Sequence, residues 1–243
     1  MLLIEGATLA DGRVRDVRVD RDTGRIDAVG EGLDGTETID ATGKRLLPGM
    51  IDVHVHFREP GFPHKETWAT GSRSAAAGGV TTVLDQPNTD PPTVTGEAVA
   101  EKTRLASDSL VDFGINGGVT VDWTPNSLLS APITALGEVF LADSTGDMGI
   151  DADLFRTAVE RAAEAGVPVT VHAEDADLFD ETARERAGDT PGRGADADAW
   201  SAYRTADAER AAVERACTVA VEADTRIHVA HTSTPEGIDA ASA

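Results

Sequence analysis

Two histidines stand one residue apart, His54 and His56, at the end of the apolar run that begins at Met50. Side chains alternate along a β-strand, so both imidazoles and the Asp52 carboxylate are predicted to point to one face. Two imidazoles at the end of a strand can bind a divalent metal such as zinc. A pair of ordinary hydrogen-bonded histidines is the alternative, because short motifs of this kind often occur without a metal.

Two further histidines end predicted strands. His172 ends the run 167–172, and His231 ends the run 227–231. Four of the six histidines therefore lie at the carboxyl ends of strands, which is the edge where parallel barrels carry their active sites. This shared placement favours a metal site over four unrelated histidines.

The remaining two histidines are expected to do something else. On a regular strand His228 faces the side opposite to His231, so we expect it to point toward the helices in a structural role. Ile227 and Val229 would then face inward with His231. His64 lies in a loop before the first predicted helix, and we expect it to be solvated.

Other polar residues could complete such a site. A carboxylate could bridge two metals, and Glu138 and Asp143 are the candidates in the fourth strand. Their parity differs, so only one can point inward unless a bulge intervenes, and the other would pair elsewhere.

Arg58 could bind a substrate carboxylate with two hydrogen bonds, and Asn88 could hydrogen-bond a polar ring. A surface cation and a turn-capping amide are the alternatives for these two residues.

The scaffold for these residues is predicted from the alternation of strands and helices after Met50. Such alternation indicates a parallel sheet covered by helices. The sequence contains six such units, whereas a closed (β/α)8 barrel needs eight. The predicted strands are 50–56, 80–85, 111–115, 138–141, 167–172 and 227–231, and the predicted helices are 66–77, 97–106, 152–165 and 206–223.

The two ends of the chain differ from this pattern. Short alternating runs at 2–4, 14–19 and 25–29 are separated by turn dipeptides, which predicts a small antiparallel sheet within residues 1–47. At the other end, 235–243 resembles the start of a sixth helix, with no seventh or eighth strand after it. We therefore expect the chain to be a fragment of a longer protein. The glycine-rich, charged segment 184–203 is expected to be a mobile loop above the site.

The composition excludes several functions. The chain has 43 acidic and 21 basic residues among 243, a net charge of −22. This charge argues against nucleic-acid binding through a cationic face and against an anionic membrane surface. Without a long apolar run or a basic leader, a cytoplasmic protein is the expectation. The acidity indicates a salt-loving source.

The single cysteine, Cys217, excludes an internal disulfide and is predicted to be a small core residue.

The segment 48–61, with Asp52-Val53-His54-Val55-His56-Phe57-Arg58 at its centre, resembles the signature of dihydroorotases in the amidohydrolase superfamily. The resemblance continues through 78–83, 86–89, 172–175, 200–204 and 228–234, and so covers essentially the whole chain. It implies a (β/α)8 metal-dependent hydrolase barrel, of which 48–243 form an incomplete part. Residues 1–47 would be the N-terminal part of a small β-sandwich. The implied reaction is the reversible cyclisation of N-carbamoyl-L-aspartate to L-dihydroorotate in pyrimidine biosynthesis.

The resemblance also implies roles for single residues. His56, Arg58 and Asn88 match residues at the substrate, with the arginine facing its carboxylate. Two Zn²⁺ ions are expected, bridged by a carboxylate of the fourth strand. The matching metal ligands are His54, His56, His172 and His231.

This sequence departs from the family pattern at two places. Many relatives bridge the metals with a carboxylated lysine in a Lys-x-Phe pattern, and Glu138 takes that place here. Others use an aspartate at the strand end, closer to Asp143, so the resemblance favours Glu138 only slightly and both remain candidates.

The family's general base is an aspartate on the eighth strand, which is expected beyond Ala243. No catalytic base is therefore assigned in this chain, which by itself is expected to be inactive.

Two kinds of alternative function remain open. Allantoinases and dihydropyrimidinases (hydantoinases) open similar cyclic amides, but Arg58 together with Pro87-Asn88-Thr89 favours a substrate with a carboxylate. A non-catalytic, dihydroorotase-like scaffold is the other alternative, although such a protein has no need of four histidines at strand ends. A small-molecule substrate is expected, and a homo-oligomer is left open.

Overall fold

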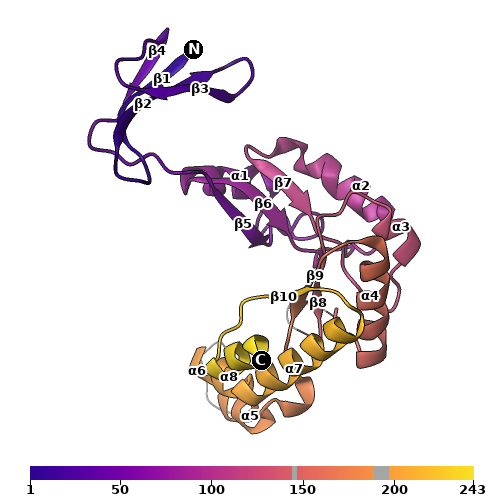
Figure 1. Ribbon diagram of the computed structural model, residues 1–243. Coiled ribbons are helices and arrows are strands. Elements are labelled where there is room, and N and C mark those ends of the chain that lie inside the picture. Colours follow the sequence, from indigo (N-terminus) through magenta and orange to yellow (C-terminus); the bar gives the residue numbers. More distant parts are fainter. Residues whose placement is uncertain (144–146, 189–196) are drawn as a thin grey trace. The chain divides into compact units, whose positions relative to one another are not determined.

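The computed structural model describes residues 1–143, 147–188 and 197–243 (Figure 1). The chain divides into two compact units, Met1–Met50 and Ile51–Ala243. Each unit has its own strands and its own buried residues.

The first unit is a four-stranded sheet with the order β3-β2-β1-β4. The first three strands pair antiparallel, as predicted. The fourth strand pairs parallel with the first, so the prediction of a wholly antiparallel sheet is wrong there. The connection before β4 returns the chain to the start of β1, where Glu37 is in register with Leu2. The Asp16 carboxylate of β2 accepts hydrogen bonds from the backbone N–H of Gly6 in β1 and of Leu33 in this connection. The strands are β1 (Leu2–Thr8), β2 (Val14–Asp20), β3 (Arg25–Gly30) and β4 (Glu37–Asp40).

Within its described residues, the second unit has six strands in two three-stranded sheets. Their orders are β5-β6-β7 and β10-β9-β8, and a parallel bridge between Gly117 and Leu136 connects the two sheets. The pairs β6–β7, β8–β9 and β9–β10 are parallel, which confirms the α/β class with parallel strands. The strands are β5 (Met50–Val55), β6 (Val80–Asp85), β7 (Asp112–Ile115), β8 (Leu136–Phe140), β9 (Val169–His172) and β10 (Ile227–Val229).

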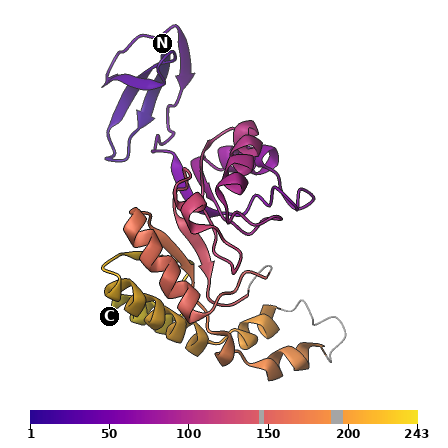
Figure 2. The same ribbon diagram turned by 90° about the vertical axis from the view of Figure 1, so that its right-hand side faces the viewer.

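Helices connect these strands, and Figure 2 shows α4 beside α7, which also packs against α8. The prediction for 152–165 is confirmed at both ends, whereas α3, α5 and α6 were not predicted. No helix within the described residues is long and apolar enough to cross a membrane. The α-helices are α1 (Trp68–Ala77), α2 (Gly96–Leu105), α3 (Pro125–Leu129), α4 (Ala152–Ala165), α5 (Glu181–Gly188), α6 (Ala197–Tyr203), α7 (Ala206–Glu222) and α8 (Pro235–Ser242), with 3-10 turns at Ala106–Asp108 and Ala176–Leu178.

Local chemistry explains where α4 begins and ends. The Asp151 carboxylate accepts a hydrogen bond from the Leu154 N–H, which satisfies one of the free N–H groups of the first turn. Gly166 then takes a left-handed conformation with φ of 68°, at the position where glycine commonly ends a helix.

Small side chains let the helices approach the sheet closely. Ala158 and Ala162 of α4 and Ala212 and Ala216 of α7 are fully buried. They share one core with strand residues such as Val171. Because a buried alanine occupies little volume, helix and strand backbones can pack closely.

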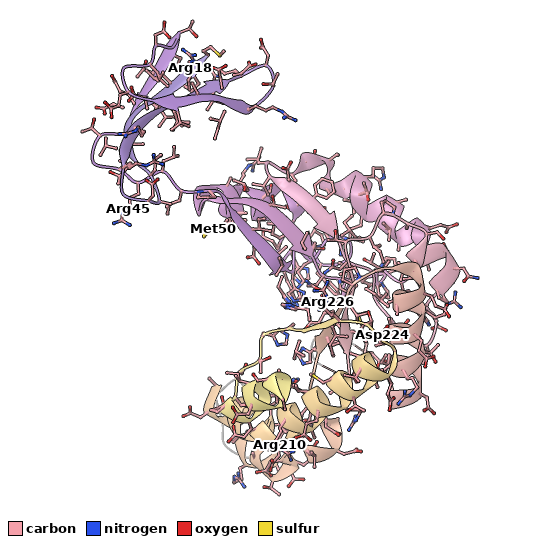
Figure 3. The ribbon with its side chains drawn as sticks, in the orientation of Figure 1. Arg18, Arg45, Met50, Arg210, Asp224 and Arg226 are labelled. Atoms are coloured by element: carbon pink, nitrogen blue, oxygen red, sulfur yellow. The ribbon has the colours of Figure 1, made fainter. Side chains whose placement is uncertain are left out.

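Helix α7 leads directly into the last strand. Cys217 lies in α7, half-buried and packed against the core, in agreement with its predicted role. The helix is followed by Asp224, which has a positive φ of 48°, and Figure 3 labels Asp224 and Arg226 on the turn that enters β10. A residue in this conformation stops the helix and redirects the chain.

The prediction for His228 is wrong. Ile227 and Val229 pack against the core shared with α7, and Val229 is in register with the fully buried Val171. His228 therefore points away from the helices. The error arose because regular alternation ends at Val229, and His231 has a positive φ of 37°. The prediction counted every second residue back from His231, and it therefore assigned Val229 and Ile227, instead of His228, to the inward face of the strand.

The segment 184–203 was predicted to be a loop. Its first residues belong to α5 and its last to α6, which contact each other. Residues 189–196 lie outside the described residues. The prediction of a loop is therefore wrong for both flanks, where charged and small residues form helices despite the glycines between them.

Candidate metal centre

The two histidines of the His-x-His motif lie at the end of β5. His54 is the fifth residue of the strand, and His56 follows its last residue. Both side chains are about a quarter exposed, and their ring centroids are 5.2 Å apart. The alternation predicted from the sequence thus brings both imidazoles to one place.

Glu138 lies in the middle of β8, and all five residues of that strand are buried. Its side chain is only 2% exposed. The preceding residue, Gly137, has a φ of 134°, and a Cβ there would collide with the carbonyl oxygen of Thr170 in the neighbouring strand. Only glycine fits this close approach, so the local backbone that presents Glu138 depends on it.

Four imidazoles surround the Glu138 carboxylate, in two pairs. Its Oε2 lies 3.2 Å from His54 Nε2 and 3.9 Å from His56 Nε2. Its Oε1 lies 2.9 Å from His172 Nδ1 and 2.6 Å from His231 Nε2. Each oxygen therefore faces one pair of histidines, as expected of a carboxylate that bridges two metal ions.

The donor set fits a zinc-type ion. Ligand atoms of His54, Glu138 and His231 all lie within 4.8 Å of one another. Imidazole nitrogen and carboxylate oxygen are ligands that zinc takes in proteins. A nearly buried carboxylate among imidazoles also has a physical need for positive charge, which protons or a metal ion can supply.

The electrostatics of the metal-free cluster follow from these contacts. Burial opposes ionisation of Glu138, but hydrogen bonds from His172, His231 and His54 outweigh it and hold its pKa far below the usual range. Burial likewise opposes protonation of His172, yet its hydrogen bonds to Glu138 and Glu174 raise its pKa to about 9. The metal-free cluster therefore holds a carboxylate and a protonated imidazole near neutral pH.

The structure places Asn88 and Arg58 beside His56. Asn88 is buried, and its Oδ1 lies 2.6 Å from His56 Nδ1. An Nδ1–H donated to this oxygen leaves Nε2, the nitrogen that faces Glu138, free to bind a metal. Burial lowers the pKa of His56, which also favours the neutral, metal-binding form. Arg58 is half-buried and donates to the Asn88 carbonyl at 3.5 Å.

Asp143 lies apart from this cluster. Its side chain is exposed, and its Oδ1 accepts a hydrogen bond of 2.6 Å from the backbone N–H of Gly149. The structure therefore brings Glu138, and not Asp143, to the four histidines. The parity argument left open which of the two carboxylates points inward, and in this structure it is Glu138.

A cavity of about 480 Å³ opens on the His172 and His231 side of the cluster. This volume suits a small organic molecule. Glu174, Trp200 and Arg204 also line it. The Glu174 carboxylate accepts from His172 Nε2 at 2.6 Å and forms an ion pair with Arg204. Arg58 and Asn88, predicted at the substrate, are not among the residues that line this cavity.

Several residues that support the cluster had no role predicted from the sequence. Glu174 lies two residues after His172, within the segment 172–175 that carries the resemblance. This closeness to His172 could have indicated its place at the site. Gln86 and Lys102 are fully buried next to the site. A lysine inside the pattern of a helix gives no sign of burial, so Lys102 could not have been found.

Parallel α/β packing, with histidines at the ends of strands around a buried carboxylate, fits the class of metal-dependent amidohydrolases. A family model described as dihydro-orotase-like matches residues 43–237. The chain belongs to this dihydroorotase-like family.

The relatives found by comparison agree with this assignment. The dihydroorotase of Halobacterium salinarum is 66% identical over 245 residues, covering 100% of this chain and 56% of that protein. The allantoinase of Rubrobacter xylanophilus is 36% identical, covering 98% of this chain and 53% of that protein. The L-hydantoinase structure from Arthrobacter aurescens matches with a TM-score of 0.82 at 26% identity, covering 98% of this chain and 54% of that one. The chain thus spans about half the length of the relatives it matches.

Proposed function

We propose that this chain is part of a dihydroorotase, which interconverts N-carbamoyl-L-aspartate and L-dihydroorotate with the help of two zinc ions. The observation that carries the proposal is the position of the Glu138 carboxylate between two pairs of imidazoles. The 66% identity to a dihydroorotase supports this substrate over those of the more distant relatives.

In this proposal His54 and His56 would hold one zinc ion and His172 and His231 would hold the other, with the Glu138 carboxylate available to both. Bound zinc would lower the pKa of a coordinated water and polarise the amide carbonyl of the substrate. The chain's own contribution is to orient the ligands, since Asn88 fixes the tautomer of His56. No residue of this chain is assigned as the general base.

We further propose that Arg58 recognises the carboxylate of the substrate. Its guanidinium lies next to His56 and offers planar donors that match a carboxylate. Orienting the substrate by its carboxylate would direct the attack to the correct carbonyl carbon. Allantoin and dihydrouracil lack this carboxylate, which distinguishes the proposal from the allantoinase and hydantoinase alternatives.

The wider architecture belongs to the same proposal. We infer that the parallel strands of the second unit are part of a (β/α)8 barrel, and that residues 1–47 contribute to a small β-sandwich. The protein would act on its small-molecule substrate in the cytoplasm. Light scattering would show whether it forms a homo-oligomer.

The direct test is a comparison of substrates with the intact, zinc-loaded protein. L-dihydroorotate, allantoin and dihydrouracil would be supplied in turn, with a chelator-treated sample as control. We expect hydrolysis of dihydroorotate alone or with a kcat/KM at least about tenfold higher. Preference for either neutral ring would contradict the proposed substrate. Bound zinc without turnover of any of the three would favour the non-catalytic scaffold.

A further inference from the structure

Lys102 is a fully buried lysine on α2. Of the three lysines in the sequence, all of which the structure describes, it alone is buried. Its Nζ forms a 2.5 Å ion pair with Asp85 and donates a 2.6 Å hydrogen bond to the Gln86 carbonyl. Burial lowers the pKa of Lys102, whereas the charge of Asp85 raises it. Lys102 thus contacts two consecutive residues, Asp85 and Gln86, at the end of β6.

Asp85 extends this contact to the residue after the His-x-His motif. Its Oδ1 accepts a 2.7 Å hydrogen bond from the backbone N–H of Phe57, which follows His56 directly. Asp85 is completely buried. The backbone that leaves β5 is therefore fixed to β6 by a side chain, beyond the end of the regular ladder.

Gln86 extends the same contact to the other half of the site. Its Nε2 donates to the Val53 carbonyl of β5 at 3.2 Å, and its Oε1 accepts from Asn116 Nδ2 at 3.3 Å. The same Oε1 accepts a 2.9 Å hydrogen bond from the backbone N–H of Glu138 in β8. One buried side chain therefore joins the strand of His54 to the strand of Glu138.

We propose that Asp85, Gln86 and Lys102 are positioning residues that set the distance between the His-x-His motif and the Glu138 carboxylate. They touch neither proposed metal nor substrate, and they act through Phe57 and Glu138. The inference rests on the proposed metal centre and adds the residues that hold its two halves in register.

A purely structural role makes a different prediction. Buried ion pairs contribute little net stability compared with apolar residues of the same shape, because desolvation offsets the attraction. Outer-shell partners of metal ligands, however, typically change metal affinity by about 10- to 100-fold when they are removed. Metal affinity at matched stability therefore separates positioning from structural support.

The first experiment compares Gln86→Met with Ser72→Ala in the intact protein. Methionine keeps the size of glutamine and removes its hydrogen bonds. Ser72 is a matched control because it is also fully buried and its Oγ accepts one backbone hydrogen bond, from Leu110. Cobalt(II) is the probe, with its affinity and its visible absorption spectrum as readouts, next to unfolding by urea.

We expect Gln86→Met to bind cobalt(II) about 10- to 100-fold more weakly, with a changed absorption spectrum. Ser72→Ala should match the wild type in both readouts, even where its stability falls. Equal affinity and equal spectra for Gln86→Met and the wild type would overturn the inference. If the wild type binds no cobalt(II), the metal centre itself is wrong and the inference falls with it, which is a distinct outcome.

A second variant covers the case in which Gln86→Met does not fold. The double variant Asp85→Asn/Lys102→Met removes both buried charges together and keeps an acceptor oxygen for the Phe57 N–H. We expect it to fold and to bind cobalt(II) at least about tenfold more weakly. A folded double variant with wild-type affinity and spectrum would contradict the role of the ion pair.

Discussion

Glu138 and His231 are 93 residues apart in the sequence, yet Glu138 Oε1 lies 2.6 Å from His231 Nε2. One residue lies in the middle of β8 and the other just beyond the end of β10, with β9 between these strands. The contact exists because parallel strands bring their carboxyl ends to one edge and because His231 turns back with a positive φ. It closes the ring of imidazoles around a single buried carboxylate.

Replacing Glu138 with glutamine should abolish the bridging charge. We expect Glu138→Gln to weaken zinc binding by more than the ~10- to 100-fold that is typical for the loss of an outer-shell partner. Asp143→Asn is the matched control, since the exposed Asp143 carboxylate caps a loop and lies apart from the cluster. Isothermal titration with zinc would measure both. Wild-type affinity in Glu138→Gln, or a large loss in Asp143→Asn, would show that the bridge has been assigned to the wrong residue.

Gly71 in α1 is predicted to tolerate no side chain. A Cβ at this position would lie 2.5 Å from the ring of Phe57, the residue after His56. We expect Gly71→Ala to lower the free energy of unfolding by about 1–3 kcal/mol through overpacking. At Gly78, φ is −82° and the nearest atoms are 3.5 Å from such a Cβ, so Gly78→Ala should be neutral or slightly stabilising. Urea denaturation of the two variants would test this, and equal stabilities would refute the steric argument.

Arg58→Ala tests the recognition of the substrate carboxylate. Loss of hydrogen bonds to a charged group should lower kcat/KM for dihydroorotate by about 10- to 100-fold in the intact, zinc-loaded protein. Zinc content should stay unchanged, because Arg58 is not among the proposed ligands. Arg73→Ala, at an exposed position of α1, is the control. An unchanged kcat/KM in Arg58→Ala would point to a neutral substrate.

The metal-free protein should lose stability as the pH rises above neutrality. The pKa of His172 is raised from 6.5 to about 9 in the folded state. Its protonated form therefore stabilises the fold fully below about 6.5, and this contribution disappears as the pH rises through about 9. The lowered pKa of Glu138 acts only at acid pH, where its contribution is lost as the carboxylate is protonated.

Zinc should reverse this behaviour. Metal ions bind neutral imidazole, so zinc affinity rises with pH over the same interval. Urea denaturation from pH 6 to 9.5, with chelator or with zinc, would compare the two states. Parallel pH profiles in both samples would argue against His172 as a ligand.

Much of the scaffold could be predicted from the sequence because its signals are local. The helical pattern predicted α4 at both ends, and the β6 strand 80–85 was likewise predicted at both ends. The helices α5 and α6 were missed because charged, alanine-rich segments next to glycines have no clear apolar face. The parallel pairing of β4 was missed because register between distant strands depends on tertiary contacts.

The candidate site was predicted in part for the same reason. His54 and His56 follow from strand alternation, and strand ends placed His172 and His231 correctly at one edge. The choice between Glu138 and Asp143 needed the packing of Gly137 against Thr170, which no local pattern reports. The orientation of His228 was misjudged because His231 leaves the strand geometry.

The most direct test of the account is a crystal structure of the zinc-loaded protein with anomalous scattering measured at the zinc edge. We expect two zinc peaks, one bound by His54 and His56 and one by His172 and His231, with the Glu138 carboxylate bound to both. Zinc found elsewhere on the chain, or these four imidazoles without any bound zinc, would contradict it.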